Sequence, residues 1–223
     1  MRPVFEMAVE DDIIRRNPFS FRVVDVVPND TVPRKALAAD EKKRLLAHIL
    51  DDKCRRRYYD EVVILLGTGL RISELYGLTK SDIDFERRRI RVARQLTRTR
   101  HTGSCEYYVE KPKTESGERY IPMLDDAVYQ AFQRVIQGRR KPKIEYIIDG
   151  HTNFLFLDKD GKPKVAGHLE HAMKRIEDHY NDSHIDQLTV TPDVGTTMNT
   201  YAHSNYDTAQ QAFDKFIVVG SKS

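Results

Sequence analysis

Residues 67–75 read GTGLRISEL and interrupt an otherwise helical pattern, with an arginine placed just after the interruption. Glycine ends helices readily, because it adopts the left-handed backbone that a helix end often requires. We expect a new helix to start at once, with Arg71 in its first turn, where backbone N–H groups and the helix dipole favour an anion. The guanidinium there can clamp a phosphate through two hydrogen bonds, or simply pair with Glu74 three residues later.

The sequence predicts helices on both sides of this stretch. Before it, apolar residues at helical spacing predict one helix from Asp40 and another from about Tyr58 to Leu66. After it, similar patterns predict helices that begin near Asp125 and near Val165, and a last one from Thr208 to Phe216.

Between these helices the pattern changes to the period of two that strands show. Ile90 and Val92 alternate with arginines, and further strand-like runs cover residues 107–109 and 119–122. Lys113 lies between the last two runs in a segment of turn composition, so we expect it near the tip of a hairpin that joins them. The expected fold is mainly α with a small antiparallel β-sheet (α+β).

Composition limits the class of protein. With 223 residues, 39% of them hydrophobic and 32% charged, the chain can form one domain with an appendage or two small domains. It has no apolar run near the roughly 20 residues of a membrane span and no signal-peptide pattern, so we expect a cytoplasmic protein without a membrane partner. Cys54 and Cys105 lie far apart, which predicts neither a disulfide nor a zinc site.

The net charge of +3 is weak evidence for nucleic-acid binding, but the basic residues are clustered. The clusters are Arg55–Arg57, Arg87–Arg89 with Arg91 and Arg94, Arg98 with Arg100, and Arg139–Arg140 with Lys141 and Lys143. Each can neutralise phosphates. For any single cluster we favour a solvated face balanced by nearby acids, because charge runs usually form such surfaces.

Two further residues have suitable chemistry. Tyr201 lies in a polar segment with no apolar stripe to join, and tyrosine can act as a covalent nucleophile. A structural role is the default for any one of 11 tyrosines. Lys113 can contact a phosphodiester or protonate a leaving oxygen, although turn lysines are mostly exposed residues without a specific role.

Three segments together resemble the tyrosine recombinase family, and most of all the integrases of phages and conjugative transposons. They are GTGLRISEL (67–75), KPKTESGERYIP (111–122) and TMNTYAH (197–203). The resemblance implies that residues 34–223 form the tyrosine recombinase catalytic domain with a C-terminal tail. It makes residues 1–33, with their prolines and short amphipathic segment, the end of a core-binding domain and an interdomain linker that continue from a preceding segment.

The resemblance also implies a mechanism. Tyr201 attacks a DNA phosphodiester and forms a 3'-phosphotyrosine, while Arg71 clamps the phosphate, Lys113 acts as general acid, and Glu74 and His203 support them. A phosphotyrosine retains the bond energy, so neither a cofactor nor a metal is expected. The expected DNA contacts are Arg94, Arg98, Arg100, Lys111 and Arg119.

The activity so implied is site-specific recombination that integrates and excises a mobile element. The expected partners are double-stranded DNA with specific recombination sites and further copies of the chain, from dimer to tetramer, with the C-terminal tail docked on a neighbour or on its own domain. Two alternatives stay open: an inactive DNA-binding relative, and a type IB topoisomerase, against which the hairpin and the short tail argue.

One part of the family pattern is missing. The family has a His-x-x-Arg block and then a histidine or tryptophan before the tyrosine, and this sequence has neither. Residues 189–192 resemble the sequence before the first block and residues 193–196 the sequence after the second, so a segment is missing between Pro192 and Asp193. Either the protein has that stretch and this sequence leaves it out, or the protein itself carries a deletion there. We favour the first, because losing a core helix would cost more than the roughly 5–15 kcal/mol by which a domain is stable. A real deletion predicts an inactive protein.

Overall fold

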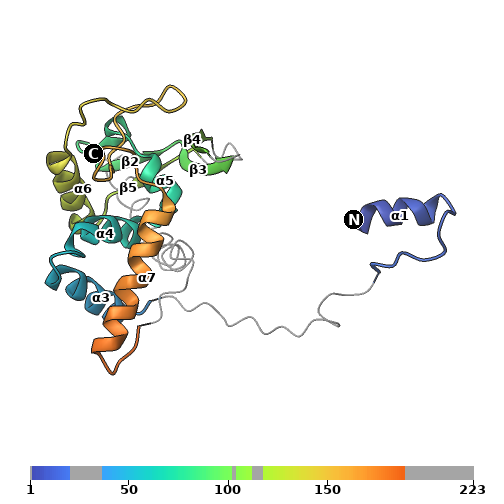
Figure 1. The fold of residues 1–223 in the computed structure, drawn as a ribbon, viewed down its shortest axis with the longest axis horizontal. Coiled ribbons are helices and arrows are strands. Elements are labelled where there is room, and N and C mark those ends of the chain that lie inside the picture. The colour runs from blue at the N-terminus through green and yellow to red at the C-terminus, as the bar shows by residue number, and fades with distance from the viewer. Residues whose placement is uncertain (1, 21–36, 102–103, 112–117, 189–223) are drawn as a thin grey trace, which may run out of the picture. The chain divides into compact units, whose positions relative to one another are not determined.

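The computed structural model describes residues 2–20, 37–101, 104–111 and 118–188 (Figure 1). The chain divides into two units, Met1–Arg34 and Lys35–Ser223. In the first unit, helix α1 (Arg2–Glu10) is followed by a turn that brings the Phe19 ring to 5.1 Å from the Phe5 ring. Asn17 secures this turn, because its Nδ2 donates to the Arg2 carbonyl at 3.2 Å.

The second unit is built mainly from helices. They are α3 (Ala39–Asp51), α4 (Tyr59–Thr68), α5 (Ile72–Gly77), α6 (Asp126–Gly138) and α7 (Ala166–Ser183), with 3-10 turns at Arg56–Tyr58 and Lys80–Asp82. The helices predicted to begin near Asp40, Tyr58, Asp125 and Val165 are confirmed. Asp125 begins α6 as predicted, because its Oδ1 accepts from the Ala127 N–H at 2.8 Å. The helix predicted over Thr208 to Phe216 lies outside the described residues.

Within the described residues, the strands form two small antiparallel sheets. Strands β1 (Ile83–Asp84), β2 (Arg89–Val92) and β5 (Arg119–Pro122) pair in the order β1-β2-β5, while β3 (Gln95–His101) pairs with β4 (Ser104–Glu110). The prediction of an antiparallel sheet in a mainly α fold is confirmed.

The predicted pairing of the strands is wrong, because residues 107–109 pair with β3 and residues 119–122 pair with β2. The observed register sets buried Ile90 opposite buried Ile121 and buried Leu96 opposite Val109. A register with apolar partners on the core side is the one that burial selects. Lys113, predicted at the tip of the other hairpin, lies outside the described residues.

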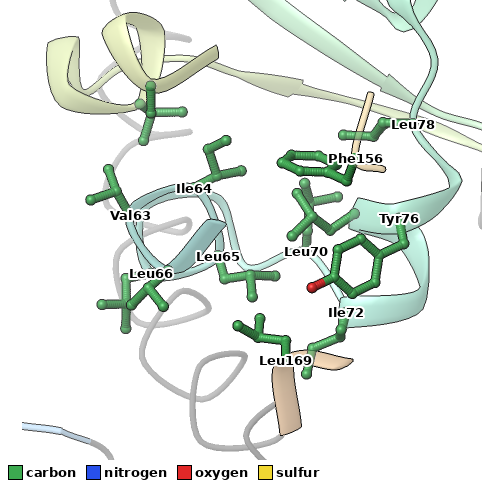
Figure 2. Close-up of a cluster of buried hydrophobic side chains, with 14 of the residues drawn as sticks. Val63, Ile64, Leu65, Leu66, Leu70, Ile72, Tyr76, Leu78, Phe156 and Leu169 are labelled. Carbon is green, nitrogen blue, oxygen red and sulfur yellow. The ribbon is translucent and has the colours of Figure 1, made fainter. Parts of the chain in front are cut away.

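Helix α4 lies at the centre of the core. Its residues 62–66 are all buried, and it packs against α3 on one side and α6 on another. Figure 2 shows Leu65 of α4 near Leu70, Tyr76 of α5 and Leu169 of α7, with Leu66 and Val63 on another side of the same helix. Residues 62–66 are buried on every side of the helix, so this stretch of α4 is apolar all round. Among the described residues, no helix is long and apolar enough to cross a bilayer.

The predicted glycine break is confirmed at the end of α4. Gly69 has φ +68°, and its N–H donates to the Leu65 carbonyl at 3.0 Å. A left-handed residue of this kind ends the helix at little cost only when it is glycine. The chain therefore turns directly from α4 into α5, and Arg71 lies at the corner between two core helices.

A buried carboxylate joins three parts of the core. Glu61 of α4 is 2% exposed; its Oε2 accepts from the Tyr76 hydroxyl of α5 at 2.6 Å, and its Oε1 pairs with the Lys164 ammonium. Burial and the Glu61 carboxylate raise the pKa of Tyr76, so this hydroxyl stays protonated and donates. The network locks α5 against α4.

We expect Tyr76→Phe to lower the free energy of unfolding by about 1–3 kcal/mol, because the buried Glu61 carboxylate loses one of its donors. Urea unfolding followed by circular dichroism measures this change. Tyr120→Phe is the control, since the Tyr120 side chain is exposed and its ring contact with Arg89 survives the change. Equal losses in the two variants would contradict a structural role for the buried hydroxyl.

Candidate functional site

Arg71, Glu74 and Arg119 meet at the start of α5. The Glu74 side chain is 1% exposed, and each carboxylate oxygen accepts two hydrogen bonds. Oε1 accepts from Nη1 of Arg71 at 3.0 Å and from Nη1 of Arg119 at 3.0 Å. Oε2 accepts from the Arg71 backbone N–H at 2.9 Å and from Nη2 of Arg119 at 2.9 Å. One buried carboxylate therefore holds two guanidinium groups.

The charge of this cluster is positive. Burial alone would raise the pKa of Glu74, but the hydrogen bonds from Arg119 and Arg71 outweigh it and hold the pKa below its usual value. Glu74 is therefore a carboxylate at neutral pH, and the three side chains carry one net positive charge. The Arg71 side chain is 61% exposed and that of Arg119 31%, so the Arg71 guanidinium is the part of the cluster most accessible to an anion.

The cluster corrects one detail of the sequence-based picture. Arg71 precedes α5 as its N-cap residue, and its backbone N–H donates to Glu74. The predicted pairing with Glu74 and an accessible guanidinium are thus found together. Binding of an anion would fall to the side chain, because the Glu74 carboxylate already occupies the helix start.

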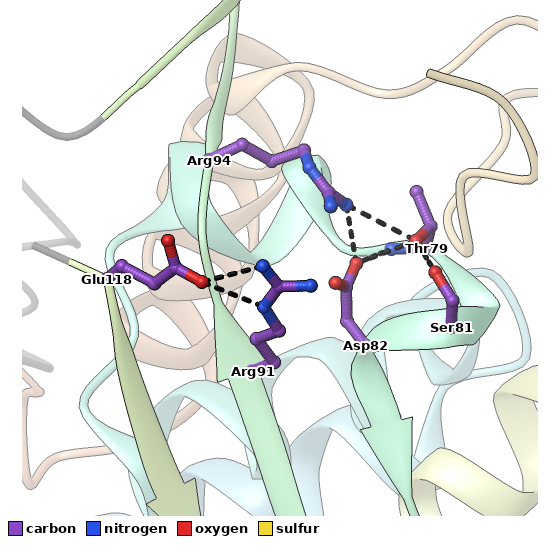
Figure 3. Close-up of polar contacts among 6 residues, drawn as sticks. All are labelled: Thr79, Ser81, Asp82, Arg91, Arg94 and Glu118. Atoms are coloured by element: carbon purple, nitrogen blue, oxygen red, sulfur yellow. Dashed lines mark hydrogen bonds and ion pairs between the residues drawn. The ribbon is translucent and has the colours of Figure 1, made fainter.

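Arg94, one of the predicted DNA contacts, is turned into the fold. Its side chain is 11% exposed, and its Nη1 donates to Oδ2 of Asp82 at 2.6 Å and to the Thr79 hydroxyl at 3.2 Å. Asp82 is itself buried and accepts from the Thr79 N–H at 2.8 Å (Figure 3). This guanidinium neutralises a buried carboxylate and fixes the turn that follows α5.

The hairpin formed by β3 and β4 carries further predicted contacts. Leu96 anchors its base in the core, and the Val109 N–H donates to Oδ2 of Asp149 at 2.7 Å. Beyond that base, Arg98 is exposed, with its guanidinium carbon 5.5 Å from the centre of the Tyr107 ring. The backbone of Arg100 pairs with Cys105 across the hairpin, and exposed Lys111 follows β4.

Most other basic clusters are matched by acids. Arg91 donates to Oε1 of Glu118 from both Nε, at 2.9 Å, and Nη2, at 2.6 Å (Figure 3). Other ion pairs in these clusters are Arg88 with Asp126, Arg89 with Asp84, Arg55 with Asp52 and Arg139 with Glu145. The favoured interpretation of a balanced charged surface fits these clusters.

The remaining predicted site residues, Lys113, Tyr201 and His203, lie outside the described residues. The described ranges contain no group of three or more His, Cys, Asp and Glu side chains that could hold a metal ion. What the structure brings together is therefore the arginine half of the predicted site: Arg71 with Glu74, and Arg119 beside them.

Comparisons with known proteins identify relatives. Residues 35–192 match the phage integrase family. The transposase from transposon Tn916 of Enterococcus faecalis is 39% identical over 238 residues, which cover 94% of this chain and 58% of that protein. The Tn1549 transposon integrase in complex with a circular intermediate DNA has a TM-score of 0.82 and 44% identity, covering 93% of this chain and 64% of that one. The same integrase in complex with transposon right end DNA has a TM-score of 0.81 and 45% identity, with the same coverage.

Two features of these matches concern the extent of the chain. It spans 58% of the length of the Tn916 transposase. The alignment with that relative is 238 residues long, more than all 223 residues of this chain, so the relative has residues inside the matched region that this chain lacks. The match to the family ends at residue 192, where the sequence resemblance is also interrupted.

Proposed function

The chain belongs to the phage integrase family, and from this we propose that it is the DNA-cleaving and DNA-joining part of a site-specific recombinase that integrates and excises a mobile element. The observation that carries the proposal is the exposed guanidinium of Arg71, held by a buried carboxylate within the GTGLRISEL segment. The relatives support the substrate, since one is described as a transposase and another as a transposon integrase in complex with DNA.

The proposed reaction begins at Tyr201. Its oxygen bonds to the phosphorus of a DNA phosphodiester and its proton passes to water, while the bond from phosphorus to the 5'-oxygen breaks. Lys113 donates a proton to that oxygen, which departs as a 5'-hydroxyl. The 3'-phosphotyrosine is later attacked by the 5'-hydroxyl of a partner strand, which restores both the tyrosine and a phosphodiester.

In this reaction Arg71 stabilises charge on phosphorus-bound oxygens. Such oxygens gain negative charge in the transition state, and a cation that is already positioned lowers the barrier without having to reorganise. Glu74 keeps Arg71 in place, and we assign His203 a supporting part beside Tyr201. Arg98, Arg100 and Lys111 would contact the DNA backbone from the β3–β4 hairpin and the segment after it.

The proposed partners are double-stranded DNA with paired recombination sites and further copies of the chain, from dimer to tetramer. For the C-terminal tail, docking on a neighbouring copy and docking on its own domain both stay predictions. We place the protein in the cytoplasm, because the Tn916 relative comes from a bacterium, Enterococcus faecalis, and bacterial DNA lies there. We assign residues 1–33 to the end of a core-binding domain and its linker.

The proposal requires the segment that the sequence lacks between Pro192 and Asp193. The longer alignment with the Tn916 transposase and the end of the family match at residue 192 both support a missing internal stretch. An intact-mass spectrum of the expressed protein decides the matter. A mass above 25.9 kDa, with peptides that contain a His-x-x-Arg block, would mean that the active protein has the stretch.

The activity itself is tested with two labelled DNA fragments that carry the junction sequences of the element, and separately with an unrelated supercoiled plasmid. We expect joined products from the paired fragments and a protein–DNA adduct that resists detergent, with the plasmid left supercoiled. Relaxation of the plasmid would instead indicate a type IB topoisomerase.

The second candidate is a DNA-binding relative without the chemistry. A mass that equals 25.9 kDa favours it, because Arg71 and Lys113 alone form a poor clamp for a pentacoordinate phosphate. Such a protein would shift the labelled fragments in a gel and yield neither an adduct nor a joined product.

A further inference from the structure

Arg119 lies where it can control Arg71. Its guanidinium forks onto the Glu74 carboxylate at 3.0 and 2.9 Å, and Oε1 of that carboxylate also accepts from Arg71. The backbone of Arg119 is fixed by β5, where it pairs with buried Val92 of β2. The sheet therefore sets the position of Arg119, Arg119 sets the Glu74 carboxylate, and Glu74 sets Arg71.

We infer that Arg119 is a positioning residue for Arg71, which acts through Glu74 by holding the carboxylate and by supplying its countercharge. This inference rests on the proposed function and replaces the expectation that Arg119 contacts DNA. Its side chain is 31% exposed, half the value for Arg71, and both outer nitrogens are bonded to Glu74.

The electrostatic reason for this role lies in the charge balance around the buried Glu74 carboxylate. A carboxylate that is 1% exposed needs a cationic partner, because burial of an unpaired charge is costly. With Arg119 present, Glu74 is neutralised and Arg71 keeps its positive charge for a phosphate. Without Arg119, Arg71 would be the countercharge of Glu74 in this cluster, and its guanidinium would turn toward the carboxylate. Arg119 thus keeps Arg71 both positioned and available.

The test uses Arg119→Met in the full-length protein and single-turnover cleavage of labelled junction DNA. We expect cleavage to slow about 10–100-fold, the range typical when a group that orients a functional residue is removed. The dissociation constant for the DNA should change less than about threefold, with an unchanged salt dependence. Arg91→Met is the matched control. Arg91 lies on the neighbouring strand β2, directly before the residue that pairs with Arg119, and its ion pair with Glu118 is exposed. It should cleave like the wild type.

A double variant that removes both charges of the pair separates positioning from mere support of the fold. Glu74→Gln removes the charge that Arg119 neutralises, so the double variant Glu74→Gln with Arg119→Met should cleave at least about fivefold faster than Arg119→Met alone, as expected for directly coupled residues. Arg119→Lys should recover part of the activity, since lysine restores the charge without the fork. A double variant as slow as Arg119→Met would overturn the inference. So would a weaker DNA complex with a salt slope reduced by about 1, which is the mark of a lost phosphate contact.

Hydrogen exchange at the Arg71 amide provides a measurement that needs no cleavage. That N–H donates to Oε2 of Glu74, so Arg119→Met should make it exchange faster, while Arg91→Met should not. Unchanged exchange would overturn the positioning role. A wild-type protein that forms no adduct with junction DNA would instead overturn the proposed function, and the two failures are therefore distinguishable.

Discussion

Tyr201→Phe is expected to abolish the covalent protein–DNA adduct while DNA binding stays within about threefold of the wild type. The change removes the oxygen that would bond to phosphorus and leaves the ring, so the loss should be at least about 10³-fold, as when a covalent nucleophile is removed. A labelled junction fragment, run on a denaturing gel after detergent treatment, measures the adduct, and a native gel measures binding.

Tyr206→Phe is the matched control, because Tyr206 lies five residues further along the same segment. It should form the adduct normally. An adduct that persists in Tyr201→Phe and disappears in Tyr206→Phe would move the nucleophile to the second tyrosine, and an adduct that persists in both would remove this segment from the proposed reaction.

The sequence predicted the helices well because their signals are local. Apolar spacing and the Asp125 cap lie within the helix that they specify, and the break at Gly69 needs only one left-handed residue. Strand pairing depends on partners far apart in the chain. The runs at 107–109 and 119–122 flank a turn-like segment and so predict one hairpin, yet each pairs with an earlier strand that sets a buried residue opposite one of its apolar residues.

The partners of the Arg94 and Arg119 side chains were also hard to predict, because they lie far from these arginines in the sequence. Arg94 follows an alternating run and looked like part of a DNA-facing surface, but it neutralises buried Asp82. A signal was available, because a threonine three residues before an aspartate is typical of a turn that draws the carboxylate onto the backbone, and Thr79 with Asp82 has that spacing. No comparable signal joins Arg119 to Glu74, since 45 residues separate them and only the fold brings them together.

Arg71→Lys is the second prediction with a large expected effect. The guanidinium has donors enough to bond Glu74 through Nη1 and still present a flat fork to two phosphate oxygens, whereas the lysine ammonium is a single point of charge. If the ammonium stays with Glu74, the phosphate loses its clamp; if it turns to the phosphate, it loses the contact that positions it. We expect cleavage to slow about 10²–10³-fold, the usual cost of removing one positioned donor from a transition state.

Folding should survive this change, because Arg119 still neutralises the buried Glu74 and the backbone N–H of residue 71 still donates to it. Thermal unfolding and DNA affinity should therefore match the wild type, while single-turnover cleavage falls. The matched control is Arg134→Lys on α6, where the arginine forks onto Asp60 at the surface and has no part in the proposed reaction. Cleavage by Arg71→Lys at the rate of the Arg134→Lys control would remove Arg71 from the site, and the exposed guanidinium could then no longer carry the proposed function.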